Sequence, residues 1–224
     1  MSEGRLGALL RLVFITPGRR DASAAQILSL IEQVLEGGAT AILLREPQLG
    51  LADREALYSP AVKTIHAAGA LALVSKDVGL AVACGADGVQ LGYGSPTVGE
   101  TRARAPGLAV GRSCHWPLVQ DDWLADYVML SPFRPTHRSL DRPLLTADQV
   151  HSIVAHPGLG PVVALGGLTA ADVPDLPDGL AGLAVIRSLS EARDPRGAAA
   201  VLRSQADARW SFGGSQGGAT DGLL

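Results

Sequence analysis

The sequence predicts a single (β/α)8 barrel in residues 1–205 of the 224-residue chain, and two observations support this fold. Short apolar runs recur along the chain, and each is followed by a polar or glycine-containing loop and then by a helix-like segment. Eight such units without a shift in composition favour a closed barrel of parallel strands. The runs are 12–15, 41–44, 71–74, 88–91, 108–111, 127–130, 161–165 and 183–186.

The loop after the first run separates the barrel from its main alternative. An open doubly wound sheet that binds a dinucleotide carries the pattern G-x-G-x-x-G at this place. Here the loop reads Thr16-Pro17-Gly18-Arg19-Arg20, which lacks that pattern. The sequence therefore favours the barrel.

Helix signals lie between the runs. Ser23 and Gln26 form a capping-box pattern before apolar residues at helical spacing, and Gly37 follows the last of these residues. Thr146 and Gln149 repeat the capping-box pattern later in the chain. The segments after the third, fourth and fifth runs are short, so we expect helices of only two turns there.

The last residues of the chain, 206–224, are predicted to form a disordered tail. From Ser211 onward they consist mainly of glycine and small polar residues, which bury too little apolar surface to pack.

Composition restricts the location and the partners of the protein. Hydrophobic residues make up 47% of the chain and aromatic residues only 4%, as expected for aliphatic strands buried on both faces. The net charge of −3 gives no reason to expect binding to nucleic acid or to a membrane. Two cysteines are too few for a disulfide framework, and we find no signal peptide or membrane-spanning run. We expect a cytoplasmic protein, and a homo-oligomer (a dimer or a tetramer) is left open.

Cationic residues follow the predicted strands, at the end of the barrel where ligands bind in this fold. They outnumber the carboxylates there, although the chain as a whole is acidic. We therefore expect an anionic ligand at this end of the barrel. The cations are Arg45, Lys76, Arg112, Arg134, Arg138, Arg142 and Arg187, and the carboxylates are Glu46, Asp77 and Asp141.

A glycine pair after the seventh run predicts a phosphate site. Gly166 and Gly167 precede Thr169 at a helix start, so backbone N–H groups there can approach phosphate oxygens. The turn at Arg187-Ser188 after the eighth run would complete this site. The alternative is that the glycines only permit a tight turn.

His115 is the residue best suited to acid–base chemistry. It follows the fifth run, and strand alternation places it on the same side as Ser113 and opposite Cys114. Imidazole exchanges protons near neutral pH. The alternative is a histidine that only bonds a neighbour. His137, in the loop after the sixth run, is a weaker candidate, and the alternation argues against a Cys114–His115 nucleophile pair.

Five stretches of the chain occur in the order and at the spacing of a known family. They are GGATAILLRE at 37–46, GADGVQLG at 85–92, GRSCH at 111–115, SPFRPT at 131–136 and ALGGL at 164–168. Together they resemble the thiamine phosphate synthase/TenI group of barrels over roughly residues 10–204. The family's synthases join a hydroxymethylpyrimidine diphosphate to a thiazole phosphate, and a Mg²⁺ ion helps the pyrophosphate to leave.

The chain departs from the synthases at their metal and pyrophosphate positions. The synthases carry Asn-Asp after the third strand, where this chain has Ser75-Lys76, and another Asp shortly after the fourth strand, where it reads Tyr93-Gly94-Ser95. Two lysines that bind pyrophosphate in the synthases correspond to Pro47 and Ser139. The resemblance therefore implies that both metal carboxylates and both lysines are missing.

These departures predict the TenI branch of the family. The implied activity is a thiazole phosphate tautomerase, an isomerase that needs no metal or cofactor, with a small phosphorylated thiazole as substrate and His115 as the acid–base residue. Tyr93 is a candidate to pack against the thiazole ring. The expected substrate- and phosphate-binding residues are Arg45, Lys76, Ser113, Thr136, Arg138, Gly166, Gly167, Ile186, Arg187 and Ser188.

Three alternatives stay open. One is a thiamine phosphate synthase with altered metal and pyrophosphate ligands. Another is a protein that binds thiazole phosphate or thiamine phosphate without catalysis. The third is a different barrel enzyme that acts on a phosphosugar, because this fold supports many chemistries.

Overall fold

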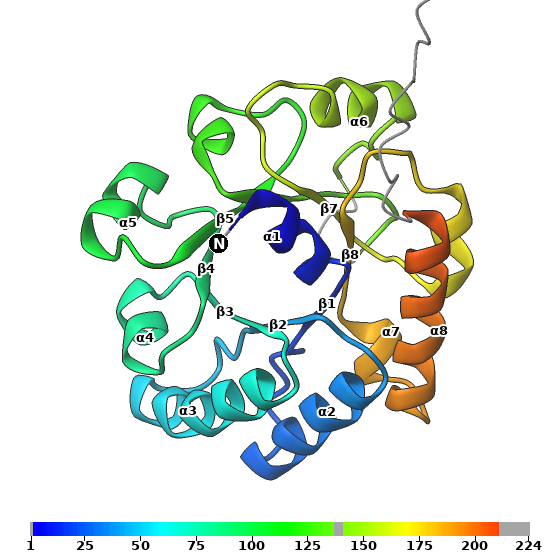
Figure 1. Cartoon of the computed structure of the whole chain (residues 1–224). Helices are drawn as coiled ribbons and strands as arrows, with labels where there is room; N and C mark the ends of the chain where they lie inside the picture. Colours follow the sequence, from blue (N-terminus) through cyan, green and yellow to red (C-terminus); the bar gives the residue numbers. More distant parts are fainter. Residues whose placement is uncertain (1, 137–140, 211–224) are drawn as a thin grey trace, which may run out of the picture.

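A computed structural model describes residues 2–136 and 141–210. The eight strands form a closed parallel barrel in the order of the sequence (Figure 1). The predicted (β/α)8 barrel is confirmed. The strands are β1 (Leu12–Ile15), β2 (Ala41–Leu44), β3 (Leu71–Ser75), β4 (Gly88–Leu91), β5 (Ala109–Cys114), β6 (Tyr127–Leu130), β7 (Val162–Leu165) and β8 (Gly182–Val185).

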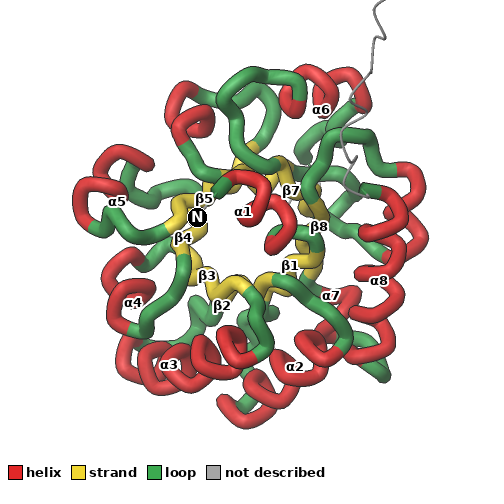
Figure 2. The backbone as a smooth tube through the Cα atoms, viewed as in Figure 1, coloured by secondary structure: helices red, strands yellow, loops and turns green. Residues whose placement is uncertain are grey.

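Helices surround the barrel (Figure 2). The α-helices outside the strands are α2 (Ala24–Glu36), α3 (Leu51–Ala67), α4 (Val78–Ala83), α5 (Val98–Arg104), α6 (Ala147–Val154), α7 (Arg187–Ser190) and α8 (Pro195–Arg209). Two 3₁₀-helices, η1 (Gln120–Leu124) and η2 (Ala170–Asp175), follow β5 and β7. The segments after β3, β4 and β5 are short, as predicted.

The predicted capping boxes start α2 and α6. The Ser23 hydroxyl accepts the Gln26 N–H, and the Gln26 side chain accepts the Ser23 N–H in return. Thr146 and Gln149 make the same pair of contacts. The sequence analysis missed a third box, in which Thr97 and Glu100 start α5.

An additional helix, α1 (Glu3–Leu9), precedes the first strand and was not predicted. It lies over the barrel opening in Figure 1 and Figure 2, at the end where the strands begin. Leu6 and Leu10 pack with the inward-facing strand residues, which include Val13 and Met129. The amino-terminal end of the barrel is therefore closed by apolar side chains, and the carboxyl ends of the strands carry the polar groups.

Two predicted boundaries need correction. Residues 109–111 of the run 108–111 belong to a longer strand, because β5 begins at Ala109, continues to Cys114 and pairs with β6 up to Cys114–Leu130. Helix α8 continues to Arg209, and Trp210 is buried against the core. The disordered tail predicted for 206–224 is therefore wrong for residues 206–210, and residues 211–224 lie outside the described residues. In the described part of the chain, no helix has the length and apolar character needed to cross a bilayer.

Candidate active site

A cavity of about 420 Å³ opens at the carboxyl ends of β2 and β3. Four cations and two carboxylates line it, although the chain carries a net charge of −3. This excess of positive charge in a concave site favours an anionic ligand. The charged lining residues are Arg45, Glu46, Arg54, Lys76, Asp77 and Arg104.

The first wall of the cavity is fixed by the end of β2. The Arg45 N–H donates to the Thr16 hydroxyl at 2.7 Å, and the Glu46 N–H donates to the Tyr58 hydroxyl at 2.9 Å. Burial raises the pKa of Tyr58 to about 12, so the phenol stays protonated. The backbone that carries Arg45 is thus held from β1 and from α3.

Both carboxylates of the cavity are already engaged by neighbours. Glu46 is 1% exposed and accepts hydrogen bonds from the Gln48 side chain at 2.5 Å and from the Gly18 N–H at 3.4 Å. Asp77 accepts the Leu80 N–H at 3.0 Å at the start of α4, and it pairs with Arg54 at 3.4 Å. These contacts leave the cavity with a cationic character.

Lys76 has an unusual backbone at the end of β3. Its φ of 66° is the only positive φ of a non-glycine residue among the described residues. The Lys76 N–H donates to the Gln90 carbonyl at 2.9 Å, and its ammonium group donates to the Tyr93 carbonyl at 2.9 Å. Hydrogen bonds to β4 and to the loop that follows it therefore fix both the backbone and the side chain of Lys76.

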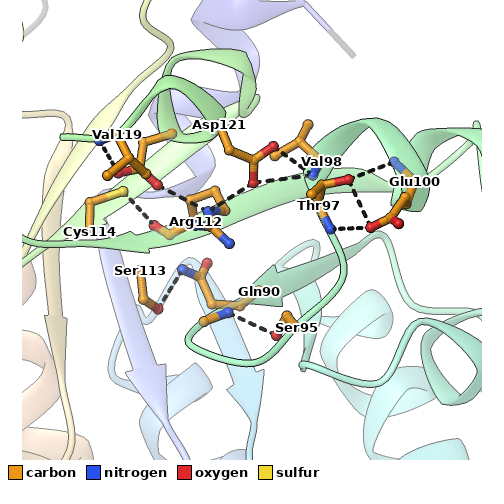
Figure 3. Close-up of polar contacts among 12 residues, drawn as sticks. Gln90, Ser95, Thr97, Val98, Glu100, Arg112, Ser113, Cys114, Val119 and Asp121 are labelled. Atoms are coloured by element: carbon orange, nitrogen blue, oxygen red, sulfur yellow. Dashed lines mark hydrogen bonds and ion pairs between the residues drawn. The ribbon is translucent and has the colours of Figure 1, made fainter.

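Next to this cavity, two polar side chains lie inside the barrel between β4 and β5. The Gln90 amide donates to the Ser113 hydroxyl at 3.1 Å (Figure 3). The side-chain amide oxygen of Gln90 (Oε1) and the Tyr127 hydroxyl are buried and have no hydrogen-bond partner in the part of the chain that the structure describes. Both atoms lie close to Gly111, where a Cβ would overlap them. Unpaired buried polar atoms are rare, so these are available to a water molecule or to a ligand.

The other face of β5 is structural. Arg112 pairs with Asp122 at 3.0 Å and with Asp121 at 3.5 Å, on the outer side of the strand (Figure 3). We expected Arg112 among the cations at the ligand-binding end of the barrel. That expectation was wrong, because its guanidinium is paired with Asp121 and Asp122 of η1. Cys114 is buried on the same outer side, and burial raises the pKa of its thiol.

His115 lies at the end of β5 and contacts the end of β6. Its Nδ1 is 2.7 Å from the Ser131 carbonyl oxygen and 3.2 Å from the Ser131 hydroxyl. A carbonyl oxygen only accepts, so Nδ1 carries a proton in this contact. Nε2 is then the ring nitrogen that faces away from this contact.

Gly166 and Gly167 have φ values of 114° and 65°, which favour glycine. A Cβ on Gly166 would be 3.1 Å from the Pro132 Cα, and one on Gly167 would be 2.8 Å from the Pro135 carbonyl oxygen. The close approach of the β6–α6 loop therefore explains the glycines by itself, and their phosphate-binding role stays a prediction. In this loop Arg134 pairs with Asp172 at 2.6 Å.

The segment after β8 contacts the loop that follows β7. The Ser188 hydroxyl donates to the Leu168 carbonyl, Ile186 is half-buried, and Arg187 is exposed. α7 is a single turn of four residues at this place.

Contacts between neighbouring loops bring the predicted residues into two groups. Arg45 and Lys76 share the cavity at β2 and β3. The other group contains Ser113, His115, the glycine pair and Ser188. His115 contacts Ser131, Gly166 lies close to Pro132, and Ser188 donates to Leu168, which follows the glycine pair. Thr136 is half-buried in the β6–α6 segment. Arg138 and His137 lie outside the described residues.

Sequence reasoning missed four residues of this end of the barrel. Arg54 and Arg104 lie in helices, so no rule about strand ends points to them. Gln90 and Tyr127 lie within strands, and Gln90 was detectable as the one polar side chain in an otherwise apolar run.

A family model described as thiamine monophosphate synthase matches residues 12–189. The chain belongs to this family. A thiamine-phosphate synthase from Thiobacillus denitrificans is 34% identical over 82% of this chain and 90% of its own length. One from Bacillus licheniformis is 30% identical over 93% of this chain and 96% of its own length.

Solved structures agree with the family. A thiamine phosphate pyrophosphorylase from Pyrococcus furiosus superposes with a TM-score of 0.80 at 27% identity, and the match covers 91% of this chain and 98% of that one. A 3-hexulose-6-phosphate synthase from Salmonella typhimurium reaches a TM-score of 0.67 at 14% identity, with 89% of this chain and 99% of that one covered, and it shows the fold alone.

The comparisons correct one expectation about activity. The departures from the synthase pattern predicted an isomerase of the TenI branch. The relatives and the family structure are instead named as synthases or as a pyrophosphorylase, which are transferases, and none of these names supports a tautomerase. Substitutions at a few ligand positions therefore do not outweigh similarity along most of the chain.

The Mg²⁺ ion that the family resemblance implies does not fit this cavity. The two carboxylates there are bonded to neighbouring groups, and the ammonium of Lys76 lies at the same opening. Within the described ranges, no three His, Cys, Asp or Glu side chains group closely enough to hold a metal ion. The chemistry of this site is therefore derived from the protein's own side chains.

Proposed function

We propose that this chain is a thiamine-phosphate synthase with altered diphosphate ligands. It would join a pyrimidinylmethyl diphosphate to a small phosphorylated thiazole and release diphosphate. The observation that supports this proposal most is similarity to curated synthases at 30–34% identity over 82–93% of the chain. The basic cavity at the carboxyl ends of β2 and β3 agrees with a diphosphate substrate.

The reaction requires stabilisation of a leaving anion. The bond between the pyrimidinylmethyl carbon and the diphosphate oxygen breaks, and the oxygen keeps the electron pair. The thiazole nitrogen uses its lone pair to form the new C–N bond, so no proton has to move. Fixed cations placed around the departing diphosphate lower the energy of this transition state. Arg45, Arg54 and Lys76 are the side chains proposed for this role.

The remaining predicted residues form the proposed thiazole phosphate site. The glycine turn at Gly166 and Gly167, with Ile186, Arg187 and Ser188 at the end of β8, lies beside the strand ends that carry His115. The Ser131 carbonyl fixes the His115 ring, so its Nε2 is directed away from that contact and can bind a substrate ring. Ser113 and Thr136, and Arg138 beyond the described residues, complete the proposal.

The location and partners of the protein belong to the same proposal. A cytoplasmic location suits an enzyme whose substrates are small phosphorylated metabolites. No step of the reaction calls for nucleic acid or a membrane. A homo-oligomer (a dimer or a tetramer) is part of the same proposal.

The decisive experiment incubates the purified chain with both precursors and measures thiamine phosphate by mass spectrometry. Parallel reactions contain Mg²⁺ or EDTA. We expect product above the uncatalysed background, and we expect Arg45→Ala to lower its rate. Thermal stabilisation by thiazole phosphate without any product would contradict the proposal, because it would indicate a binding protein instead.

A further inference from the structure

We infer that Lys76 and the guanidinium groups beside it bind the diphosphate directly, so that this site holds a diphosphate without a divalent cation. The inference rests on the proposed function and names the ligand of its cavity. It also explains why the cavity lacks carboxylates that are available to a metal.

The first argument is the backbone of Lys76. At a φ of 66° glycine would be the default residue, because a Cβ is unfavourable there. The chain nevertheless carries a lysine here, in the lining of a cavity that also contains Arg45, Arg54 and Arg104. Strained backbone of this kind gathers at ligand sites, where the surrounding structure holds it in place. Here the hydrogen bond from the Lys76 N–H to Gln90 does so.

The second argument is the position of the ammonium group. Its contact with the Tyr93 carbonyl at 2.9 Å uses one of three N–H donors. This hydrogen bond is exposed to solvent, and Lys76 itself lines the cavity. The ammonium is therefore anchored at the opening and is placed to donate to an anion that enters.

The third argument is the state of the carboxylates. A divalent cation of the Mg²⁺ type is usually held through one or two carboxylates. Glu46 is buried and bonded to Gln48, whereas Asp77 is bonded to Leu80 and Arg54. To bind a metal, Asp77 would have to give up the contact with Arg54, next to a second positive charge on Lys76. Direct binding of the anion by the Lys76 ammonium, which has two further N–H donors, requires no release of a carboxylate.

Calorimetric titration with inorganic pyrophosphate in EDTA tests this inference on the complete chain. We expect the wild type to bind pyrophosphate in EDTA. Lys76→Gly removes the ammonium and also relieves the positive φ, so this variant is expected to stay folded while its affinity falls about tenfold, the equivalent of about 1.4 kcal/mol. Lys76→Arg keeps the charge and should retain most of the affinity.

The matched control is Lys63, the other lysine of the chain, which is exposed on α3. Because position 63 lies inside a helix, glycine there would destabilise the helix, and alanine is used instead. The Lys63→Ala variant should bind pyrophosphate as the wild type does. The inference is overturned if the wild type binds pyrophosphate only when Mg²⁺ is present. It is also overturned if folded Lys76→Gly binds as tightly as the wild type.

The two proposals fail in different ways. Pyrophosphate binding in EDTA without formation of thiamine phosphate would reject the proposed function and support the metal-free anion site. Formation of thiamine phosphate that depends strictly on Mg²⁺, together with pyrophosphate binding that also depends on it, would support the function and reject the inference.

Discussion

Neighbouring side chains at the end of β5 lie in opposite environments. His115 contacts Ser131 at the open end of the barrel, whereas Cys114 is buried among the helices and has a raised thiol pKa. A thiol with a raised pKa holds less thiolate at neutral pH, and the thiolate is the reactive form. Cys114 is therefore a core residue and does not act with His115 as a nucleophile.

This difference predicts the order in which the cysteines react. Burial raises the thiol pKa of both Cys84 and Cys114, but Cys84 is half-buried and Cys114 is 1% exposed. In the native protein iodoacetamide should modify Cys84 first at pH 8, and in urea both cysteines should react. Peptide mass spectrometry measures the two sites. Faster labelling of Cys114 in the native state would contradict its burial.

Gly111 illustrates a steric requirement at the same scale. An added Cβ would overlap the Tyr127 ring and the Gln90 amide. Gly111→Ala should lower the free energy of unfolding by about 1–3 kcal/mol, because overpacking of a dense core forces neighbours to move. Urea denaturation measures this change.

Gly99 provides the control for Gly111. It lies on α5 with open space around its Cα, and alanine favours a helix over glycine by about 1 kcal/mol. Gly99→Ala should therefore be neutral or stabilising. Equal destabilisation by both variants would show that the crowding at Gly111 is not the cause.

At the scale of elements, η1 is attached to β5 through a buried ion pair. The Asp122 side chain is 6% exposed, pairs with Arg112 at 3.0 Å, and also accepts the Val119 N–H at 3.0 Å. Asp122→Ala would leave the half-buried guanidinium with the more distant Asp121. Loss of one partner of a buried pair costs about 3–5 kcal/mol, and the remaining Asp121 contact should place this variant at the lower end of that range.

The exposed pair of Arg19 and Asp21 serves as the comparison for Asp122. Its atoms approach to 2.6 Å, but both side chains are in solvent. Asp21→Ala should not change the urea midpoint measurably, because exposed ion pairs contribute little. If the Asp122 and Asp21 variants had the same stability, burial of the Arg112 pair would not contribute to the attachment of η1.

Local signals in the sequence predicted most of the elements. The runs 12–15, 41–44, 88–91 and 127–130 coincide with strands, because a strand buried on both faces reads as a continuous apolar segment. β5 extends past its apolar part, since Arg112 and Ser113 find polar partners on opposite sides of the strand. These partners lie 10 and 23 residues away in the sequence, outside the span of a strand pattern, so no local pattern indicates them.

The site was predicted in part for a similar reason. The rule that ligands bind at strand ends placed Arg45 and Lys76 at one opening, and the structure has both in the same cavity. The same rule wrongly included Arg112, whose side chain lies on the outer face of β5. It did not include Arg54, which lines the cavity from helix α3. Strand-end rules give the position of a residue and not the direction or the partner of its side chain.

On the scale of the whole molecule, charge is distributed unevenly. The chain is acidic overall, yet its cavity at β2 and β3 is basic, and apolar side chains with α1 close the opposite end. Function in this fold resides at the carboxyl ends of the strands, while the other end serves stability. In the described residues, the basic cavity therefore lies at the end of the barrel where ligands bind in this fold.

A crystal structure of the protein grown with pyrophosphate in EDTA tests this account most directly. We predict pyrophosphate in the cavity at β2 and β3, with one of its oxygens about 2.7–3.2 Å from Lys76 Nζ and another near the Arg45 guanidinium. Pyrophosphate bound elsewhere on the barrel, or an empty cavity at saturating pyrophosphate, would contradict it.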